Sequence, residues 1–308
     1  MGRLDGPMSR LLVALQMRWL SALLACAALT IGQAAAAELP EGSSDYVFSD
    51  WDGTPLRVYT YRPANVAADQ PIMIVMHGVE RDADRYRDEW IAVAKKTGLI
   101  IAAPEFSDKK FPKSTNYNLG GLGKRQRENG IASAFDAIEP LFDDLRQRTG
   151  SPRQKYYLYG HSAGAQFVHR FVFAKPDARI ETAFAANAGW YTMLQADASF
   201  PYGLKGSGLP DSTISNALSA PLVVLLGDAD TDTGGNLRST PEADAQGKTR
   251  LERGLNFFRA SASLADQQQL PFAWQLAIVP GAGHQNHKMA WGVRDFFAKA
   301  TVETASAD

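Results

Sequence analysis

The stretch Lys155-Tyr156-Tyr157-Leu158-Tyr159-Gly160-His161-Ser162-Ala163-Gly164 decides the fold of this chain. An apolar, tyrosine-rich run ends on a glycine, and Ser162 then stands in the pattern G-x-S-x-G. This pattern is typical of a nucleophile elbow, a sharp turn from a strand into a helix that lifts a serine hydroxyl clear of the backbone. Apolar residues at helical spacing follow, from Phe167 to Val172. We therefore expect a buried strand, a turn at Ser162 and a helix behind it.

Outward from this turn, apolar runs alternate with helical patterns. Continuous apolar runs are typical of strands buried on both faces of a parallel sheet, and we expect such strands at 71–76, 99–103, 180–186, 221–226 and 272–279. The spacing of apolar residues predicts helices at 86–96, 131–148 and 288–300. Asp52-Gly53 is a hairpin signal between two short β-prone runs, 45–48 and 56–61. The alternation predicts an α/β protein with a mostly parallel central sheet and helices on both faces.

Two long irregular stretches, 107–129 and 191–220, interrupt this alternation. Loops of this length are uncommon in a compact domain unless they serve a function. Both follow the end of a predicted strand, at the edge where open α/β sheets bind ligands. We expect these two stretches to shape a pocket.

The composition of the chain is that of a globular protein with a substantial core. Of its 308 residues, 45% are hydrophobic and 21% are charged. The net charge of -1 gives no electrostatic argument for binding nucleic acid or an anionic membrane surface. No linker divides residues 38–308, so we predict one domain over that range.

The N-terminus has the pattern of a secretory signal peptide. Arginines precede an uncharged apolar run from Trp19 to Ile31, which is short for a membrane span, and the segment closes on four alanines that end at Ala37. We predict cleavage after Ala37 and export of residues 38–308 to the periplasm or the extracellular space, with no membrane association after signal removal. The single cysteine, Cys26, lies in a loosely lipobox-like sequence, so a lipoprotein signal is the alternative.

A serine nucleophile needs a base that takes its proton and a carboxylate that holds the base. When the serine stands on an elbow of this kind, the acid and then the histidine follow it along the chain. Of the five histidines, only His284 and His287 satisfy this order. His284 lies in a glycine-rich turn directly after the last predicted strand, whereas His287 falls at the start of the last helix. We predict that His284 is the base for Ser162.

Three carboxylates compete for the role of the acid. Asp228, Asp230 and Asp232 follow one of the predicted strands. A glycine at the strand end with the acid three positions on selects Asp230, with Asp232 as the runner-up and Asp228 as a residue that orients the turn. The same acids resemble the start of an EF-hand calcium loop. Thr233 stands where that loop needs glycine and Ser239 where it needs glutamate, so we predict no metal site.

The oxyanion of a tetrahedral intermediate needs two backbone N–H donors. Ala163, directly after the serine, is the first predicted donor. The turn His77-Gly78-Val79 is predicted to supply the second, from the N–H of Val79. We expect His77 to brace this turn by hydrogen bonds, His161 to pack in the elbow, and His169 to be an ordinary helix residue.

The chain resembles the α/β-hydrolase superfamily, and within it the secreted esterases and polyhydroxybutyrate depolymerase-like proteins. The resemblance rests on His77-Gly78, the elbow at 160–164, the turn from Gly227 to Asp230, and Gly283-His284. These residues span most of 38–308 in the expected order. The resemblance implies a hydrolase that needs no cofactor and works through an acyl-enzyme intermediate.

The fold does not fix the substrate. The irregular stretches bring aromatic residues toward the predicted site, and we expect Tyr117 and Trp190 to contact the substrate, with core packing as the alternative for Trp190. Arg81, Arg85 and Arg87 follow the oxyanion turn. They either attract a carboxylate of the substrate or face water beside their acidic neighbours.

Three hypotheses about function follow. The leading one is a secreted serine hydrolase that cleaves carboxylic esters, in small molecules or in polymers, through Ser162, Asp230 and His284. The second is a serine peptidase on the same fold. The third is a binding protein that has lost turnover, and the presence of all three triad residues argues against it.

Overall fold

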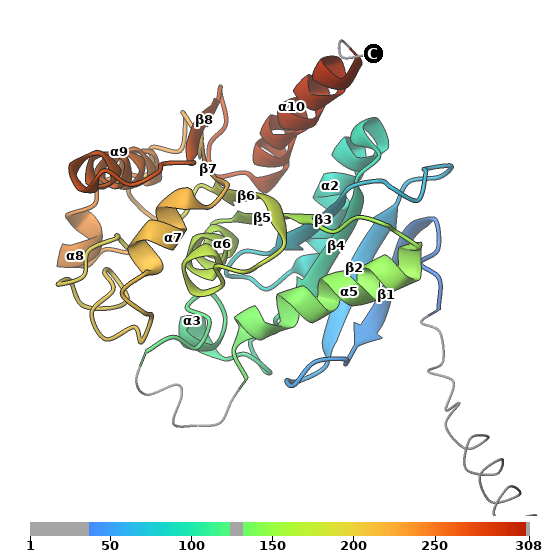
Figure 1. Cartoon of the computed structure of the whole chain (residues 1–308), viewed down its shortest axis with the longest axis horizontal. Helices are drawn as coiled ribbons and strands as arrows, with labels where there is room; N and C mark the ends of the chain where they lie inside the picture. The colour runs from blue at the N-terminus through green and yellow to red at the C-terminus, as the bar shows by residue number, and fades with distance from the viewer. Residues whose placement is uncertain (1–36, 124–131, 306–308) are drawn as a thin grey trace, which may run out of the picture. The chain divides into compact units, whose positions relative to one another are not determined.

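The computed structural model describes residues 37–123 and 132–305 (Figure 1). All of the predicted signal peptide except its last residue lies outside the described residues, and its cleavage stays a prediction. From Glu38 onward the described residues form one compact unit. None of the described helices combines the length and the hydropathy that a membrane span needs.

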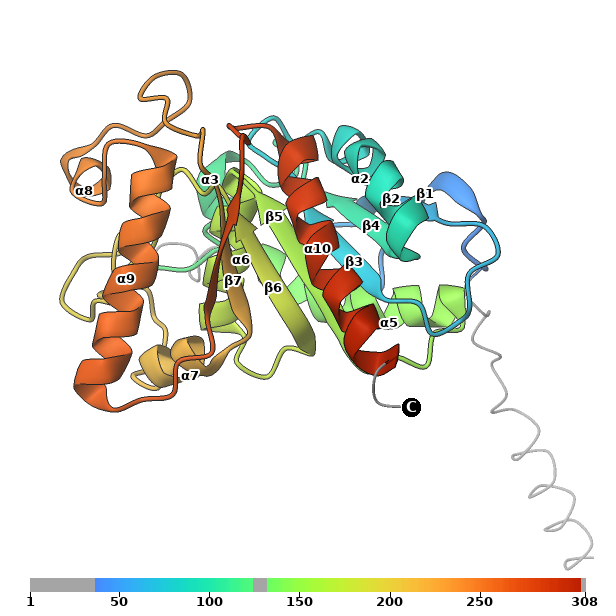
Figure 2. The ribbon, with the colours of Figure 1, turned by 90° about the horizontal axis from the view of Figure 1, so that it is seen from above.

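An eight-stranded sheet forms the centre of this unit, in the order β1-β2-β4-β3-β5-β6-β7-β8 (Figures 1 and 2). β1 (Gly42–Phe48) and β2 (Leu56–Arg62) form the predicted hairpin. β2 also runs antiparallel to β4 (Ile100–Glu105), and every later pair in the order is parallel. The predicted fold class, with its mostly parallel central sheet, is therefore confirmed.

The other strands are β3 (Ile72–Met76), β5 (Tyr156–His161), β6 (Ile180–Ala186), β7 (Leu222–Gly227) and β8 (Gln275–Val279). Every residue of β3 and β7 is buried, and burial on both faces explains their continuous apolar sequences. β8 is an edge strand, and its side chains Leu276 and Ile278 are exposed. β5 and β7, which precede Ser162 and Asp230, lie in the interior of the sheet, whereas β8, which precedes His284, lies at its edge.

Helices cover both faces of the sheet (Figure 2). On one face lie α2 (Ala83–Thr97) and α10 (Asn286–Ala305), and on the other lie α5 (Ile138–Thr149), α6 (Ala163–Ala174), α7 (Thr213–Ser219) and α9 (Arg250–Gln268). β3 shows the division: Met73 and Val75 pack in the core beneath α2 and α10, whereas Ile74 packs in the core beneath α5 and α6. Because successive side chains of a strand point to opposite faces of the sheet, one apolar run contributes to both cores.

One long helix is absent from the elements predicted above. α9 has 19 residues, and its first turn carries a capping signal, because the side chain of Thr249 accepts the N–H of Glu252 at 3.1 Å. A Thr followed three residues later by Glu is a start signal that the sequence offers. α9 matters for the site because it begins with Arg250.

Two other elements are shorter than predicted. The strand expected from residue 272 begins at Gln275, because the N–H of Ala273 and the indole N–H of Trp274 donate to carbonyls of α7 instead of a neighbouring strand. The helix expected at 131–148 starts as the short 3-10 helix η1 (Ala134–Ala137) ahead of α5. In the irregular stretches, the described part of 107–129 contains the four-residue helix α3 (Lys113–Asn116), and 191–220 contains α7. Another four-residue helix, α8 (Pro241–Asp244), lies between β7 and α9.

Candidate active site

Ser162 stands at the turn between β5 and α6 with φ 58° and ψ -115°. A positive φ is strained for a residue other than glycine. A Cβ on Gly160 would lie 2.2 Å from the carbonyl oxygen of Gly164, and a Cβ on Gly164 would lie 2.1 Å from that of Met76. Only glycine therefore allows β5, α6 and β3 to approach closely enough to hold the serine in this conformation.

Side chains from three strand ends meet at this serine. The Nε2 atom of His284 lies 3.1 Å from Ser162 Oγ, and its Nδ1 atom lies 2.7 Å from Asp230 Oδ2. Ser162 follows β5, Asp230 follows β7 and His284 follows β8. Because a carboxylate accepts from Nδ1–H, the ring presents an unprotonated Nε2 to the serine hydroxyl. The structure thus brings the three predicted residues into one hydrogen-bonded chain.

The three aspartates of the turn after β7 have different surroundings. Asp230 is 1% exposed, whereas Asp232 is exposed and has no hydrogen bond or ion pair within the described part of the chain. Asp228 accepts the N–H of Gly281 at 2.7 Å, which ties the turn after β7 to the turn after β8. The geometry favours Asp230 over Asp232 as the partner of His284.

Two residues that support the site belong to no motif. Arg250 is 5% exposed, and its Nη1 atom lies 3.5 Å from the buried carboxylate of Asp230. Asn187 follows β6 with φ 49° and is fully buried. It accepts the N–H of Gly227 at 2.8 Å and donates to the carbonyl of Gly283 at 3.0 Å. Asn187 therefore joins the turn that leads to Asp230 to the turn that leads to His284.

The turn after β3 lies against the elbow, since a Cβ on Gly164 would contact the backbone of both Met76 and His77. Val79 and Ala163 border the same cavity as Ser162. Within the described residues, the N–H groups of Val79 and Ala163 donate to no other group of the chain. Ala163 is also the first residue of α6, where unpaired N–H groups and the helix dipole favour negative charge.

His77 braces this turn, in agreement with the role expected for it. Its Nδ1 atom donates to the carbonyl of Gly78 at 3.0 Å, and its Nε2 atom accepts the N–H of Phe106 at 3.0 Å. The hydroxyl of Tyr117 donates to the carbonyl of His77 at 2.7 Å. Burial lowers the pKa of His77 to about 3, so the ring is uncharged at neutral pH.

The remaining histidines differ in their surroundings. The ring of His161 lies 4.5 Å from that of His284. His169 is more than an ordinary helix residue, because it is fully buried and links the carbonyl of Ala165 to the N–H of Thr192. Burial lowers the pKa of both His161 and His169, so neither carries a charge at neutral pH. His287 is exposed at the start of α10.

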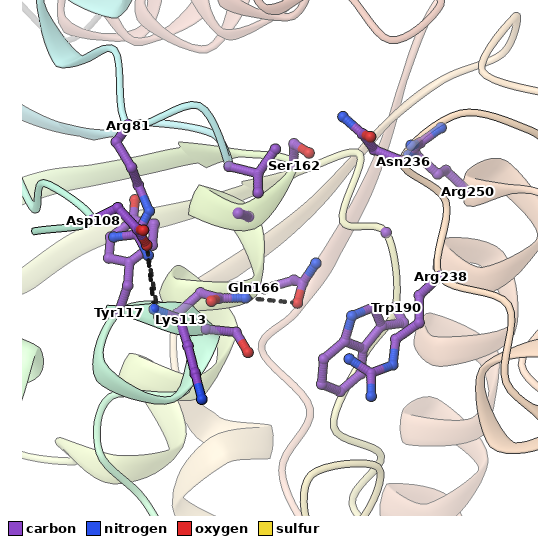
Figure 3. Close-up of a pocket in the computed structure, with 15 residues that line it drawn as sticks. Arg81, Asp108, Lys113, Tyr117, Ser162, Gln166, Trp190, Asn236, Arg238 and Arg250 are labelled. Carbon is purple, nitrogen blue, oxygen red and sulfur yellow. Dashed lines mark hydrogen bonds and ion pairs between the residues drawn. The ribbon is translucent and has the colours of Figure 1, made fainter. Parts of the chain in front are cut away.

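A cavity of about 260 Å³ opens beside Ser162 (Figure 3). Its walls carry four cations and one carboxylate: Arg81, Lys113, Arg238, Arg250 and Asp108. Figure 3 shows Arg81 and Lys113 on one side of Ser162, with Arg238 and Arg250 on the other. Asp108 lies 3.6 Å from Arg81 and Asp230 lies 3.5 Å from Arg250, so carboxylates offset two of the four positive charges. We call this space the cationic cavity.

Both aromatic residues predicted to contact substrate border the cationic cavity, and both are anchored. Tyr117 is 1% exposed and stacks on His77 with 4.6 Å between the ring centroids. Trp190 is 4% exposed, and the guanidinium carbons of Arg170 and Arg238 lie 4.3 Å and 4.9 Å from its ring centroid. Trp190 therefore packs in the core, as one prediction had it, and also borders the cationic cavity, where the other prediction had it contact the substrate.

The three arginines that follow the turn His77-Gly78-Val79 have different surroundings. Arg81 donates to the carbonyls of Phe106, Phe111 and Lys113 and forms part of the cavity wall. Arg85 pairs with Asp82 and Glu89, and Arg87 pairs with Asp88. Only Arg81 borders the cationic cavity.

A sheet that supplies serine, acid and histidine from its carboxyl edge, in that chain order, is the architecture of the α/β-hydrolases. Solved structures agree. Poly(aspartic acid) hydrolase-1 from Sphingomonas sp. KT-1 is 42% identical with a TM-score of 0.80, covering 84% of this chain and 99% of its own. The poly(3-hydroxybutyrate) depolymerase LpqC from Bordetella parapertussis is 34% identical with a TM-score of 0.79, covering 85% and 90%. The chain belongs to this poly(3-hydroxybutyrate) depolymerase-like esterase family of α/β-hydrolases and is a hydrolase.

More distant likenesses concern the fold alone. An S-formylglutathione hydrolase from Agrobacterium tumefaciens is 14% identical with a TM-score of 0.56, covering 85% of this chain and 95% of its own. The bifunctional acetylxylan esterase/xylanase XynS20E of Neocallimastix patriciarum is 19% identical over 114 residues, which is 36% of this chain, and the match spans 15% of that protein. No family model matches the chain. In the described residues, no cluster of three or more His, Cys, Asp or Glu side chains is arranged to hold a metal ion.

Proposed function

We propose that Ser162, His284 and Asp230 form a catalytic triad that hydrolyses carboxylic esters through an acyl-enzyme intermediate. The observation that carries this proposal is the hydrogen-bonded chain of 3.1 Å and 2.7 Å between the three side chains. As Ser162 Oγ attacks the carbonyl carbon, His284 Nε2 takes its proton and Asp230 stabilises the imidazolium. The N–H groups of Val79 and Ala163 are the proposed donors to the oxyanion.

The intermediate collapses when His284 returns the proton to the leaving oxygen. The bond between the acyl carbon and that oxygen then breaks, the alcohol departs, and the acyl group stays on Ser162. Water next loses a proton to His284 and attacks the acyl carbon. The bond to Ser162 Oγ breaks, Oγ regains a proton from His284, and the carboxylic acid leaves. Each step uses only groups of this site and water.

For the substrate, we propose an acyl part that carries carboxylate groups. The four cations of the cationic cavity support this choice, because guanidinium and ammonium groups near a cleft attract and bind carboxylates. The 42% identical relative is a hydrolase of poly(aspartic acid), a polymer with a carboxylate on every unit, whereas poly(3-hydroxybutyrate) has no charge along its chain. A neutral polyester would offer no carboxylate to Lys113 and Arg238, which form no ion pair within the described residues.

Amide hydrolysis is a second candidate activity, since poly(aspartic acid) is joined by amide bonds. The same triad chemistry serves both bond types, with an amine in place of the alcohol. The hypothesis of a binding protein without turnover gains no support from the geometry, because the three side chains stand within hydrogen-bond reach of one another.

Export from the cytoplasm also remains a proposal. It rests on the N-terminal sequence alone, with residues 38–308 as the exported catalytic domain. N-terminal sequencing of the mature protein tests it. A chain that begins at Glu38 supports cleavage after Ala37, a lipid-modified Cys26 supports the lipoprotein alternative, and an uncleaved chain contradicts both.

Two p-nitrophenyl esters of matched acyl length test the catalytic proposal and the choice of acyl group together. The hemisuccinate carries a carboxylate and the butyrate does not. We expect Ser162-dependent turnover of both, with a higher kcat/KM for the hemisuccinate at low salt. Turnover that survives in Ser162→Ala contradicts the triad, and an equal or lower kcat/KM for the hemisuccinate contradicts the anionic acyl group. Release of aspartate oligomers from poly(aspartic acid) tests the amide candidate.

A further inference from the structure

A second hollow, also of about 260 Å³, borders Ser162 and is lined differently. Three carboxylates lie in its wall, those of Glu80, Asp82 and Glu89, against one guanidinium, that of Arg85. Ser162 and Val79 border both spaces, so the two meet at the reacting atoms. We call the second space the acidic hollow.

The carboxylates of the acidic hollow are only partly neutralised. Arg85 donates to both Asp82 and Glu89 at 2.6 Å, and Asn286 donates to Glu89 at 2.6 Å. The second oxygen of Asp82 is buried with no hydrogen-bond partner. Glu80 is exposed and makes no ion pair within the described residues. The guanidinium of Arg85 pairs with two of the three carboxylates, and the wall keeps a net negative charge.

His161 also lies in the wall of the acidic hollow, and one of its two ring nitrogens has no hydrogen-bond partner among the described residues. The side chain is 3% exposed and borders the hollow. Its Nδ1 atom lies 3.0 Å from the hydroxyl of Tyr86, while its Nε2 atom is buried and makes no hydrogen bond. Because burial lowers the pKa of His161, its ring adds no positive charge to the wall of the acidic hollow.

The position of His284 assigns the two spaces to the two halves of the substrate. His284 borders the acidic hollow and not the cationic cavity. As the general acid, its Nε2 atom must reach the leaving atom, so the leaving group lies on the side of His284. Ala163, which follows the nucleophile, borders only the cationic cavity. The acyl part is thereby directed into the cationic cavity and the leaving part into the acidic hollow.

We propose that the acidic hollow is a leaving-group subsite that selects alcohols or amines with a cationic substituent over neutral ones, and neutral ones over anionic ones. This proposal rests on the proposed function. The enzyme then prefers negative charge on the acyl side of the scissile bond and positive charge on the leaving-group side. A substrate with carboxylates only on its acyl side fits both spaces, whereas a uniform polyanion meets repulsion in the acidic hollow.

The test compares two thioesters that differ in one charge. Acetylthiocholine and its uncharged isostere, 3,3-dimethylbutyl thioacetate, share the acyl group and the shape of the leaving group. The kcat/KM of each is divided by its rate of hydroxide-catalysed hydrolysis to remove intrinsic reactivity. At low ionic strength we expect the corrected ratio of cationic to neutral thioester to be about 5 in the unaltered protein, falling toward 1 in 0.5 M salt.

Glu80→Gln identifies the acidic hollow as the source of the preference. Removing this exposed charge is expected to lower the corrected ratio about threefold. The matched control is Glu181→Gln, the same change at an exposed residue near the start of β6, at the opposite edge of the sheet from Ser162. The control is expected to keep the ratio of the unaltered protein.

The outcomes separate this proposal from the one it rests on. A corrected ratio of 1 or below in the unaltered protein, or an equal ratio in Glu80→Gln and Glu181→Gln, overturns the leaving-group subsite. Two results count against the proposed function instead. One is turnover of either thioester that persists in Ser162→Ala, and the other is that the unaltered protein turns over neither thioester. A ratio near 5 that falls only in Glu80→Gln supports both.

Discussion

The nucleophile elbow and the walls of the cationic cavity meet at Ser162, yet different kinds of contact hold them. The elbow depends on the close approach of Gly160 to Gly164, four residues apart, at a distance of 2.2 Å for an added Cβ. The walls depend on contacts between distant segments, such as the one from Arg253 to the carbonyl of Gly189, 64 residues earlier. Crowding between residues at a fixed spacing leaves a motif in the sequence, and contacts between residues at no fixed spacing leave none.

The largest predicted effect falls on the elbow. Ser162→Ala is expected to lower kcat for p-nitrophenyl esters by about a millionfold, because within the described residues only the Ser162 hydroxyl is hydrogen-bonded to His284. His284→Ala is expected to cause a loss of the same order. Steady-state kinetics measures the loss, and an unchanged melting temperature shows that the fold survives. Residual activity above about 1% in either variant would contradict the assignment.

The second prediction sharpens the choice between two acids of one turn. Asp230→Asn is expected to lower kcat about ten-thousandfold, because the amide no longer holds His284 in the tautomer that accepts the serine proton. Asp232→Asn serves as the matched control, since that side chain is exposed, and its kcat is expected to change less than about twofold. A larger loss in Asp232→Asn would reverse the assignment.

The third prediction concerns Asn187, which joins the two turns of the triad. Asn187→Ala removes both hydrogen bonds, to Gly227 and to Gly283, and is expected to lower kcat by roughly 10- to 100-fold with little change in KM. Asn216→Ala, on α7, is the control for loss of an amide away from the site. If Asn187→Ala loses thermal stability but keeps its kcat, Asn187 supports the fold and not the alignment of the triad.

The smallest predicted effect falls on the cavity wall. Arg238→Gln is expected to raise KM for p-nitrophenyl hemisuccinate about 3- to 10-fold at low salt and to leave KM for the butyrate nearly unchanged. Arg259→Gln removes the same charge from the exposed face of α9 and is expected to change neither KM. Equal effects on the two esters would show that Arg238 acts through packing on Trp190 rather than through charge.

The sequence predicts the elbow and the parallel sheet because each leaves a local sequence pattern, and it predicts the order of the triad residues because this fold places them in one order along the chain. Gly160 and Gly164 are required by backbone approach, and buried parallel strands need continuous apolar runs. The strand at 180–186 is predicted to the residue. The spacing after Gly227 also points to Asp230, since a residue that follows the strand at once, such as Asp228, turns toward the next loop.

The walls of the cationic cavity cannot be predicted from the sequence, because the residues that give them their charge follow no common spacing along the chain. The cationic cavity combines Arg81, Lys113, Arg238 and Arg250 from three separate segments. Nothing in the local sequence of α9 indicates that its first residue reaches Asp230. Asn187 is detectable only as a polar residue at the end of a buried strand, a pattern that many structural residues share.

Reaction with a fluorophosphonate tests the central claim most directly, because the reagent modifies a serine that a base and an oxyanion site have activated. Intact mass and peptide mapping of the purified protein measure where the adduct forms. We predict one adduct per chain, on the peptide that contains Ser162, appearing at the same rate as esterase activity is lost, and no adduct in His284→Ala on the same timescale. An adduct on another residue, or full activity after complete modification of Ser162, would contradict the claim that Ser162 is the nucleophile.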